Sequence, residues 1–284
     1  MSKRGPGKRR GNDVPQRNRQ KSQSGGNRGR DFSRSAVRRE KYYVCGINVM
    51  NQVMTTQPER LIELYLLEDL GKQRQNRLSI DPSSLSVPVN YCDAETLLHL
   101  TGTENHQGVA AELRPSKMLD DDEALELLTE LKAPLILILD SIQDPHNFGA
   151  CLRTAESAGV DLVVVPRSRS VDITPVVSKV ASGAAETQRV ARVGNLARFM
   201  RSLQDMHIRL IGTDDEGVGS VYSQDLTGPL ALVMGAEGSG MRRLTQEHCD
   251  FTVSLPMRGT VESLNLSVAT GICLYEILRQ RGIG

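Results

Sequence analysis

An unbroken apolar run from Leu135 to Leu139 constrains the fold more than any other segment of the chain. A run of this length, followed by the polar Asp140, suits a strand that is covered on both faces, as in a parallel sheet. Similar runs follow at residues 162–165, 210–212, 230–234 and 251–255, with stretches of helical periodicity between them. This alternation predicts a doubly wound α/β domain over residues 133–284, closed by a long helix over residues 264–281. The small side chains Ser267, Ala269, Thr270 and Gly271 would let another element approach that helix closely.

Shorter elements alternate in the segment before this domain. We expect strands at residues 62–67, 87–91 and 108–113, and helices at residues 47–50 and after Asp93. These elements predict a small α/β domain over residues 41–115. Residues 116–132 contain three consecutive aspartates followed by a helical apolar pattern, which predicts a linker helix.

The first 40 residues differ from the rest in charge. They hold 13 of the 35 lysines and arginines but only three of the 34 acidic residues, a net charge of +10. The remaining residues hold 22 basic and 31 acidic side chains, so the body carries −9 and the sum is only +1. Because residues 1–40 have few aliphatic side chains, we expect a disordered basic arm. The arm could bind a polyanion such as RNA, or it could serve only to keep the protein soluble.

Composition excludes several classes of protein. The chain has 39% hydrophobic residues, too many for a fully disordered or fibrous protein. Aromatic residues make up only 4%, which argues against an aromatic stacking platform for single-stranded nucleic acid. The five cysteines form no CxxC pair, so we expect neither a disulfide framework nor a metal site. With no apolar segment long enough to span a membrane, we expect a cytoplasmic protein; the basic start leaves organellar targeting open.

Three junctions between a strand and the next loop carry polar residues or glycines. In open α/β sheets, ligands bind beyond the carboxyl ends of the strands. The first junction, residues 140–156, contains Asn147 and Arg153. From this stretch alone, Asn147 could be a helix N-cap and Arg153 the partner of Glu156 in a surface ion pair.

The second junction, residues 232–241, has three glycines in the pattern Gly-x-x-Gly-x-Gly. This pattern matches neither a P-loop nor a dinucleotide-binding fingerprint, so it indicates a tight turn or a close approach to a ligand. The third junction, residues 253–271, contains Ser263 and Asn265 before the last helix. Both side chains could be helix-start residues and nothing more.

Taken together, the three junctions resemble the three motifs of the SpoU/TrmH branch of the SPOUT methyltransferases. Members of this branch transfer a methyl group from S-adenosyl-L-methionine to the 2′-hydroxyl of RNA. The N-terminal segment, with His106-Gln107-Gly108-Val109-Ala110, is similar to the substrate-binding domain of the RlmB-type 23S rRNA guanosine 2′-O-methyltransferases. The resemblance thus covers both predicted domains.

The resemblance implies a trefoil knot in the C-terminal domain, a feature that no periodicity argument predicts. It also implies a homodimer with an active site completed across the two subunits, and no metal. Gly235, Leu255 and Leu264 would line the cofactor pocket, with Thr213 a further candidate. The catalytic set implied by the motifs comprises Asn147, Arg153, Glu237, Ser263 and Asn265.

The chemistry needs a ribose hydroxyl held in line with an activated methyl group. A guanidinium group is always protonated in proteins, so we assign Arg153 to holding an RNA phosphate and orienting the hydroxyl rather than to accepting its proton. Asn147, Ser263 and Asn265 would fix the geometry of the loops and the ribose. The proton acceptor stays open.

The function that follows is 2′-O-methylation of a guanosine in 23S rRNA, either free or within a ribosomal precursor. One alternative is a tRNA 2′-O-methyltransferase of the same branch, although the separate N-terminal domain argues against it. Another is a non-catalytic ribosome-assembly factor. The five motif residues that such a factor would be expected to lose are all present in this chain.

Overall fold

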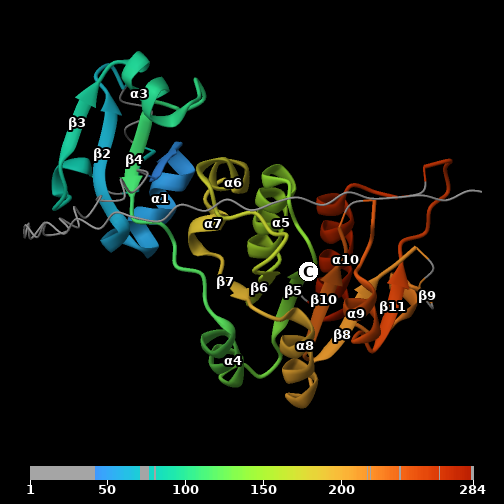
Figure 1. Ribbon diagram of the computed structural model, residues 1–284. Coiled ribbons are helices and arrows are strands. Elements are labelled where there is room, and N and C mark those ends of the chain that lie inside the picture. The colour runs from blue at the N-terminus through green and yellow to red at the C-terminus, as the bar shows by residue number, and fades with distance from the viewer. Residues whose placement is uncertain are drawn as a thin grey trace, which may run out of the picture. The chain divides into compact units, whose positions relative to one another are not determined.

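The computed structural model describes residues 42–70, 77–79, 81–215, 217, 219–236, 238–261 and 263–282. The basic arm expected over residues 1–40 and the predicted site residue Glu237 lie outside the described residues. From Tyr42 onward the described residues form one compact unit that contains two separate sheets (Figure 1).

The first sheet has four strands in the order β1-β4-β2-β3. Its strands are β1 (Tyr42–Cys45), β2 (Leu61–Leu67), β3 (Val89–Cys92) and β4 (Val109–Leu113), and its helices are α1 (Ile47–Thr56) and α3 (Ala94–Thr101). Two 3-10 turns, η1 (Pro58–Arg60) and η2 (Pro82–Ser84), precede β2 and β3. β1 and β2 run antiparallel to β4, while β3 runs parallel to β2. The sequence pattern predicted the last three strands and missed β1.

The His106-Gln107-Gly108 segment is the turn that leads into β4. Gln107 Oε1 accepts a hydrogen bond from the backbone N–H of Ile47 at 2.9 Å and so serves the first turn of α1. His106 Nδ1 accepts the N–H of Gly108 at 3.1 Å. Gly108 has φ 83°, a conformation that favours glycine. In this chain the segment connects the start of α1 to β4 of the first sheet.

The second sheet has seven strands in the order β7-β6-β5-β10-β8-β11-β9, and all its pairs are parallel. Its strands are β5 (Leu135–Leu139), β6 (Leu162–Pro166), β7 (Val190–Val193), β8 (Arg209–Thr213), β9 (Gly219–Ser220), β10 (Leu230–Met234) and β11 (Phe251–Ser254). The parallel sheet confirms the predicted α/β class. β7 and β9 were not predicted.

Helices cover both faces of this sheet, as the buried apolar runs require. α5 (Pro145–Ser157), α6 (Pro175–Ala181), α7 (Ala184–Thr187) and α10 (Leu266–Gln280) bury one face. α4 (Asp121–Thr129) and α8 (Leu196–Asp205) pack on the other face, and α9 (Arg243–Glu247) follows β10. η3 (Val221–Ser223) joins β9 to the loop before β10. All five residues of β5 are buried, and full burial stabilises each such side chain by about 1.5–3 kcal/mol.

α5 and α10 lie side by side (Figure 1). A Cβ built on Gly271 of α10 would lie 3.6 Å from Thr154 Cγ2 of α5. Cys151 Sγ donates to Thr270 Oγ1 at 3.8 Å between the same helices. The small residues of α10 therefore allow the close approach that the sequence predicted.

Candidate functional site

The carboxyl ends of β8, β10 and β11 lie next to one another, because these strands are neighbours in the sheet. Val233 of β10 pairs with Gly212 of β8, and Val253 of β11 pairs with Thr213 of β8. Gly235 and Leu255 each follow two residues after their paired strand position. The register thus brings the second and third motifs to one edge of the sheet, beside Thr213.

Gly235 has no room for a side chain. A Cβ at this position would lie 2.3 Å from both Gly240 C and Met241 N, which are backbone atoms. Ala236 and Gly240 close the loop with two reciprocal backbone hydrogen bonds of 2.9 Å. The glycine pattern therefore builds a tight turn in which two stretches of backbone touch.

Leu255 and Leu264 are both partly buried and bracket the loop after β11. Leu255 packs against the core on the α5 and α10 face. Thr213 Oγ1 donates to Val233 O at 3.3 Å, so the ends of β8 and β10 are also joined through a side chain. The partly buried Gly235 and the apolar side chains at 255 and 264 are of the kinds that suit an adenosyl group. That these three residues line the cofactor pocket stays a prediction from the resemblance.

A direct contact joins the first and third motifs. Asn265 Nδ2 donates to Asn147 Oδ1 at 2.9 Å across 118 residues of sequence. Asn265 Oδ1 also accepts the N–H of Ser267 at 3.0 Å, so Asn265 caps α10 as well. Asn147 is not a helix cap: Asp144 caps α5, accepting the N–H groups of His146 and Asn147. Asn147 lies in the first turn and is 9% exposed.

Arg153 lies on α5 and is exposed. The apolar residues Phe148, Leu152 and Ala155 turn toward the sheet and are completely buried. Among the residues that the structure describes, no acidic side chain pairs with Arg153, so the expected surface pair with Glu156 is absent there. The guanidinium is available to an external anion. Ser263, also exposed, lies on the loop before α10.

Sequence reasoning missed the ion pair that ties the first motif to the second. Asp140, 1% exposed, accepts the backbone N–H of Arg242 at 3.0 Å and its Nε at 2.7 Å. The two residues are 102 positions apart, and each follows a motif strand. An acid directly beyond a buried strand is a signal for a site, but its partner cannot be identified from the sequence alone. The pair fixes the two loops relative to each other.

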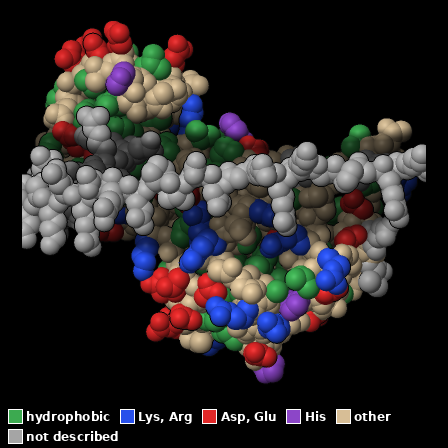
Figure 2. Space-filling model, in the orientation of Figure 1, with side chains coloured by type: hydrophobic (Ala, Val, Ile, Leu, Met, Phe, Trp, Pro, Cys, Tyr) green, Lys and Arg blue, Asp and Glu red, His purple; other side chains and the backbone are tan. Residues whose placement is uncertain are grey.

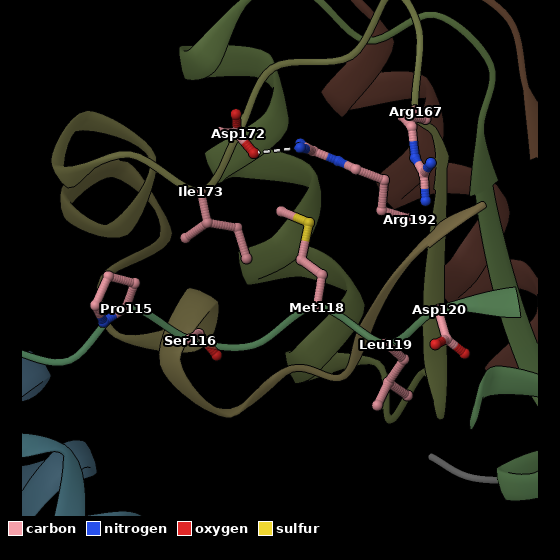
Figure 3. A pocket seen from close by; sticks show the side chains of 9 residues that line it. All are labelled: Pro115, Ser116, Met118, Leu119, Asp120, Arg167, Asp172, Ile173 and Arg192. Atoms are coloured by element: carbon pink, nitrogen blue, oxygen red, sulfur yellow. Dashed lines mark ion pairs between the residues drawn. The ribbon is translucent and has the colours of Figure 1, made fainter. Parts of the chain in front are cut away.

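Two cavities lie beside loops of the second sheet. The larger, of about 450 Å³, is lined by residues of the segment before α4 and by Arg167, Asp172, Ile173 and Arg192 (Figure 3). The smaller, of about 390 Å³, is lined by Ser141, Gln143, Arg169, Ala236 and residues 239–242. Neither contains a predicted site residue, although the smaller one borders the loop after Gly235.

The cysteines of the second sheet's core are unreactive thiols. Burial raises the pKa of the Cys151 and Cys273 thiols to about 12, which keeps both protonated and unreactive at neutral pH. All five cysteines are free. Within the described ranges, no group of His, Cys, Asp and Glu side chains could hold a metal ion, and no helix there is long and apolar enough to cross a membrane.

The fold is that of solved SpoU-type methyltransferases. The structure superimposes on the SpoU methyltransferase AviRb from Streptomyces viridochromogenes, solved in complex with the cofactor AdoMet, with a TM-score of 0.71 and 24% identity over 86% of this chain and 92% of that one. It superimposes on an AdoMet-bound rRNA methyltransferase from Sinorhizobium meliloti with a TM-score of 0.68 and 21% identity, covering 84% and 87% of the two chains. These similarities establish the fold.

The sequence defines the family. The profile of the SpoU rRNA methylase family matches residues 134–275, and the profile of the RNA 2′-O ribose methyltransferase substrate-binding domain matches residues 43–119. The chain belongs to the SpoU rRNA methylase family. It is 50% identical to the 23S rRNA (guanosine-2′-O-)-methyltransferase RlmB of Haemophilus ducreyi, over 84% of this chain and 97% of the relative. The protein of the same name from Haemophilus influenzae is 48% identical over the same shares.

Proposed function

We propose that this protein transfers a methyl group from S-adenosyl-L-methionine to the 2′-hydroxyl of a guanosine in 23S rRNA, in the cytoplasm. The observation that carries the proposal is the 50% identity to a guanosine 2′-O-methyltransferase across 97% of that relative's length. The similarity spans both sheets, so the substrate-binding part and the methyltransferase part are shared. The bridge between Asn147 and Asn265 supports it, because it joins two motifs at one edge of the sheet.

Each group of site residues would have its own role in the reaction. Bound S-adenosyl-L-methionine would supply the activated methyl group, so the protein needs no metal for this step. Gly235, Leu255 and Leu264 would hold the cofactor, with backbone groups at the strand ends and apolar contacts from the two leucines. Asn147 and Asn265 would orient the ribose, with Ser263 beside them on the loop. Glu237, predicted for the same set, lies outside the described residues.

Arg153 would bind the phosphate next to the target ribose and polarise its hydroxyl group. An exposed guanidinium with no acidic partner among the described residues suits a bidentate contact to phosphate oxygens. A fixed positive charge beside the hydroxyl favours the negative charge that develops on oxygen as the methyl group is transferred.

We also propose that the active site is completed in a homodimer. Val268 and Tyr275 of α10 are 50% and 54% exposed. They are seven residues apart, which places them on one face of the helix two turns from each other. An apolar helix face beside the helix that carries Arg153 is a suitable contact for a second copy of the chain.

We further propose that the chain consists of an RNA substrate-binding domain over residues 41–115, a linker over 116–132 and a methyltransferase domain over 133–284. Its support is that each sheet has its own apolar core.

The test is methyl transfer from tritiated S-adenosyl-L-methionine to 23S rRNA. Alkali cannot cleave after a 2′-O-methylated ribose, so the label should appear in an alkali-resistant dinucleotide that contains guanosine. Arg153→Ala should lower the rate on the order of 100-fold or more, the cost of removing a charge-stabilising group at a reacting centre, while cofactor binding by calorimetry persists. Glu156→Ala, an exposed change one turn further along α5, is the matched control and should be unaffected.

Other outcomes point to the alternative functions. Label in tRNA but not in rRNA would indicate a tRNA methyltransferase. A flat calorimetric titration with S-adenosyl-L-methionine would indicate a non-catalytic assembly factor. Loss of cofactor binding in Arg153→Ala would contradict the role assigned to that residue.

A further inference from the structure

The loop between β6 and α6, residues 167–174, contributes an arginine to each of the two cavities. Arg167 lines the larger cavity and Arg169 lines the smaller one. Figure 3 shows the Arg167 side chain beside that of Arg192 at the wall of the larger cavity. None of the site residues discussed above belongs to this loop.

The loop is held in place at several points. The N–H of Arg167 donates to Val193 O at 2.8 Å, and the N–H of Val171 donates to Ile142 O at 2.9 Å. Arg192 Nη2 donates to Val171 O at 3.3 Å. The same arginine forms an ion pair with Asp172 (Figure 3). The two loop arginines therefore project from a fixed backbone.

The backbone of Arg169 adopts a left-handed conformation with φ 65°. Residues other than glycine, asparagine and aspartate rarely adopt it, and conformations of this kind concentrate at functional sites. The turn at Arg169 explains how two arginines only two residues apart come to line different cavities. A glycine would form the same turn without strain, so the turn alone does not account for an arginine at this position.

Each cavity presents an arginine that forms no ion pair with an acid of the described residues. Arg167 and Arg169 are exposed, and no acidic side chain among the described residues pairs with either. The larger cavity is lined by two arginines and two acids: Asp172 is bound to Arg192, and Asp120 accepts two backbone N–H groups at the start of α4, which fix its carboxylate there. No acid of the described residues lines the smaller cavity, and its second arginine, Arg242, is already bound to Asp140.

The position of the loop indicates which anion it meets. The smaller cavity is bordered by Ser141, two residues after β5, and by the loop that follows Gly235, so it touches both candidate active-site loops. The larger cavity is bordered by residues 115–120, at the end of the segment that matches the substrate-binding family. Figure 2 shows Lys and Arg side chains gathered on the face over β7 and α8. An RNA strand that connects the two functional parts would pass this loop.

We propose that Arg167 and Arg169 bind two phosphates of the RNA strand that carries the target ribose. This inference rests on the proposed function and adds the residues that position the substrate. Arginine suits the role because its planar fork matches two phosphate oxygens, and the hydroxyl groups of Ser141 and Ser239 add donors in the smaller cavity. Such contacts set the register of the RNA and carry no sequence information.

The test is the salt dependence of binding to a 23S rRNA transcript. Affinity for RNA falls as salt rises, and we call the steepness of log affinity against log salt concentration the salt slope. Each phosphate contact to single-stranded RNA adds about 0.7 to this steepness. Arg167→Ala and Arg169→Ala should each lower the slope by about that amount, and the double variant by about twice as much. Cofactor binding and kcat at saturating RNA should stay unchanged while KM for RNA rises. Arg243→Ala, an exposed arginine of α9 that pairs with Glu247 and lines neither cavity, should leave the slope unchanged.

Two further variants separate contact from structure. Arg169→Gly relieves the left-handed backbone, so we expect its Tm to equal or exceed that of the wild type while its salt slope falls. Arg169→Lys keeps the charge and should keep the slope. If Arg169 were only structural, the glycine variant would lose stability and keep its slope, which would overturn the proposal.

The inference and the proposed function fail in different ways. A wild type that methylates 23S rRNA, together with a double variant of unchanged salt slope, would overturn the phosphate contacts alone. A wild type that transfers no methyl group to rRNA would overturn the proposed function and this inference with it.

Discussion

Gly235, which we propose lines the cofactor pocket, has no room for a side chain. A side chain here would meet backbone atoms of Gly240 and Met241 at 2.3 Å. Backbone atoms held by the reciprocal hydrogen bonds between Ala236 and Gly240 cannot move aside without opening the loop. The glycine is therefore required by close packing of two chain segments, a reason distinct from a positive φ.

Gly235→Ala should accordingly weaken S-adenosyl-L-methionine binding by at least about tenfold and destabilise the fold by about 1–3 kcal/mol, the usual cost of overpacking. Calorimetry and thermal unfolding measure the two effects. Gly238→Ala is the control: this glycine has φ 77° but no atom within 4 Å of its ideal Cβ, so only backbone strain of about 1 kcal/mol applies. Equal cofactor affinity in Gly235→Ala and the wild type would contradict the steric argument.

Asn147 marks the limit of what single residues reveal. The sequence offered it as a helix cap, whereas Asp144, followed by proline at the first helical position, takes that place. The Asp-Pro pair was a readable local signal. The contact of Asn147 with Asn265 and that of Asp140 with Arg242 were not readable, because each joins residues more than 100 positions apart.

The strands that the sequence predicted differ from those it missed in how much of their strand character is local. Strands that form apolar runs, such as β5 and β10, were identified because both faces of each are buried. β1 and β7 were missed: each has four residues, β1 alternates buried and half-buried positions, and β7 contains Arg192. Their strand character comes from pairing with β4 and β6, which is tertiary information. The trefoil knot likewise stays a prediction from the resemblance.

The contact of the first sheet with α6 and α7 is made by a buried polar cluster. Arg60 Nη2 and Glu186 Oε2 are 2.6 Å apart, and the Glu186 side chain is completely buried. Tyr42 and Ser178 donate to Glu186 Oε1 at 3.1 and 2.5 Å. Burial, followed by the negative charge of Glu186, raises the pKa of Tyr42. The cluster thus joins β1 of the first sheet and η1, which precedes β2, to α6 and α7, which cover the second sheet.

Arg60→Met would leave the Glu186 carboxylate buried without its cation, so we expect a loss of about 3–5 kcal/mol in unfolding free energy. Adding Glu186→Leu should recover much of that loss, because replacing a whole buried pair by apolar residues is often neutral. Chemical denaturation measures both variants. The exposed pair Arg243–Glu247, at 2.5 Å, provides the control, with less than about 1 kcal/mol expected for Arg243→Ala. A similarly small effect for Arg60→Met would show that the cluster does not hold the elements together.

At the scale of the whole molecule, the net charge of +1 conceals two opposed parts. Residues 1–40 carry +10 and the rest carries −9. An acidic body repels RNA at long range, so the arginines proposed to contact RNA must act at short range and in fixed positions. Arg153, Arg167 and Arg169 fit that requirement, and long-range attraction falls to the basic segment.

Deleting residues 1–40 should therefore weaken binding to 23S rRNA and lower the salt slope by more than any single arginine substitution, because this segment holds 13 basic residues. Cofactor binding should be unchanged, since Gly235, Leu255 and Leu264 all lie in the other part of the chain. A full-length variant with these 13 residues changed to glutamine separates charge from length and should behave like the deletion. If the deletion also reduced S-adenosyl-L-methionine binding, the basic segment would contribute to the cofactor-binding fold, and the separation of roles inferred from charge would be wrong.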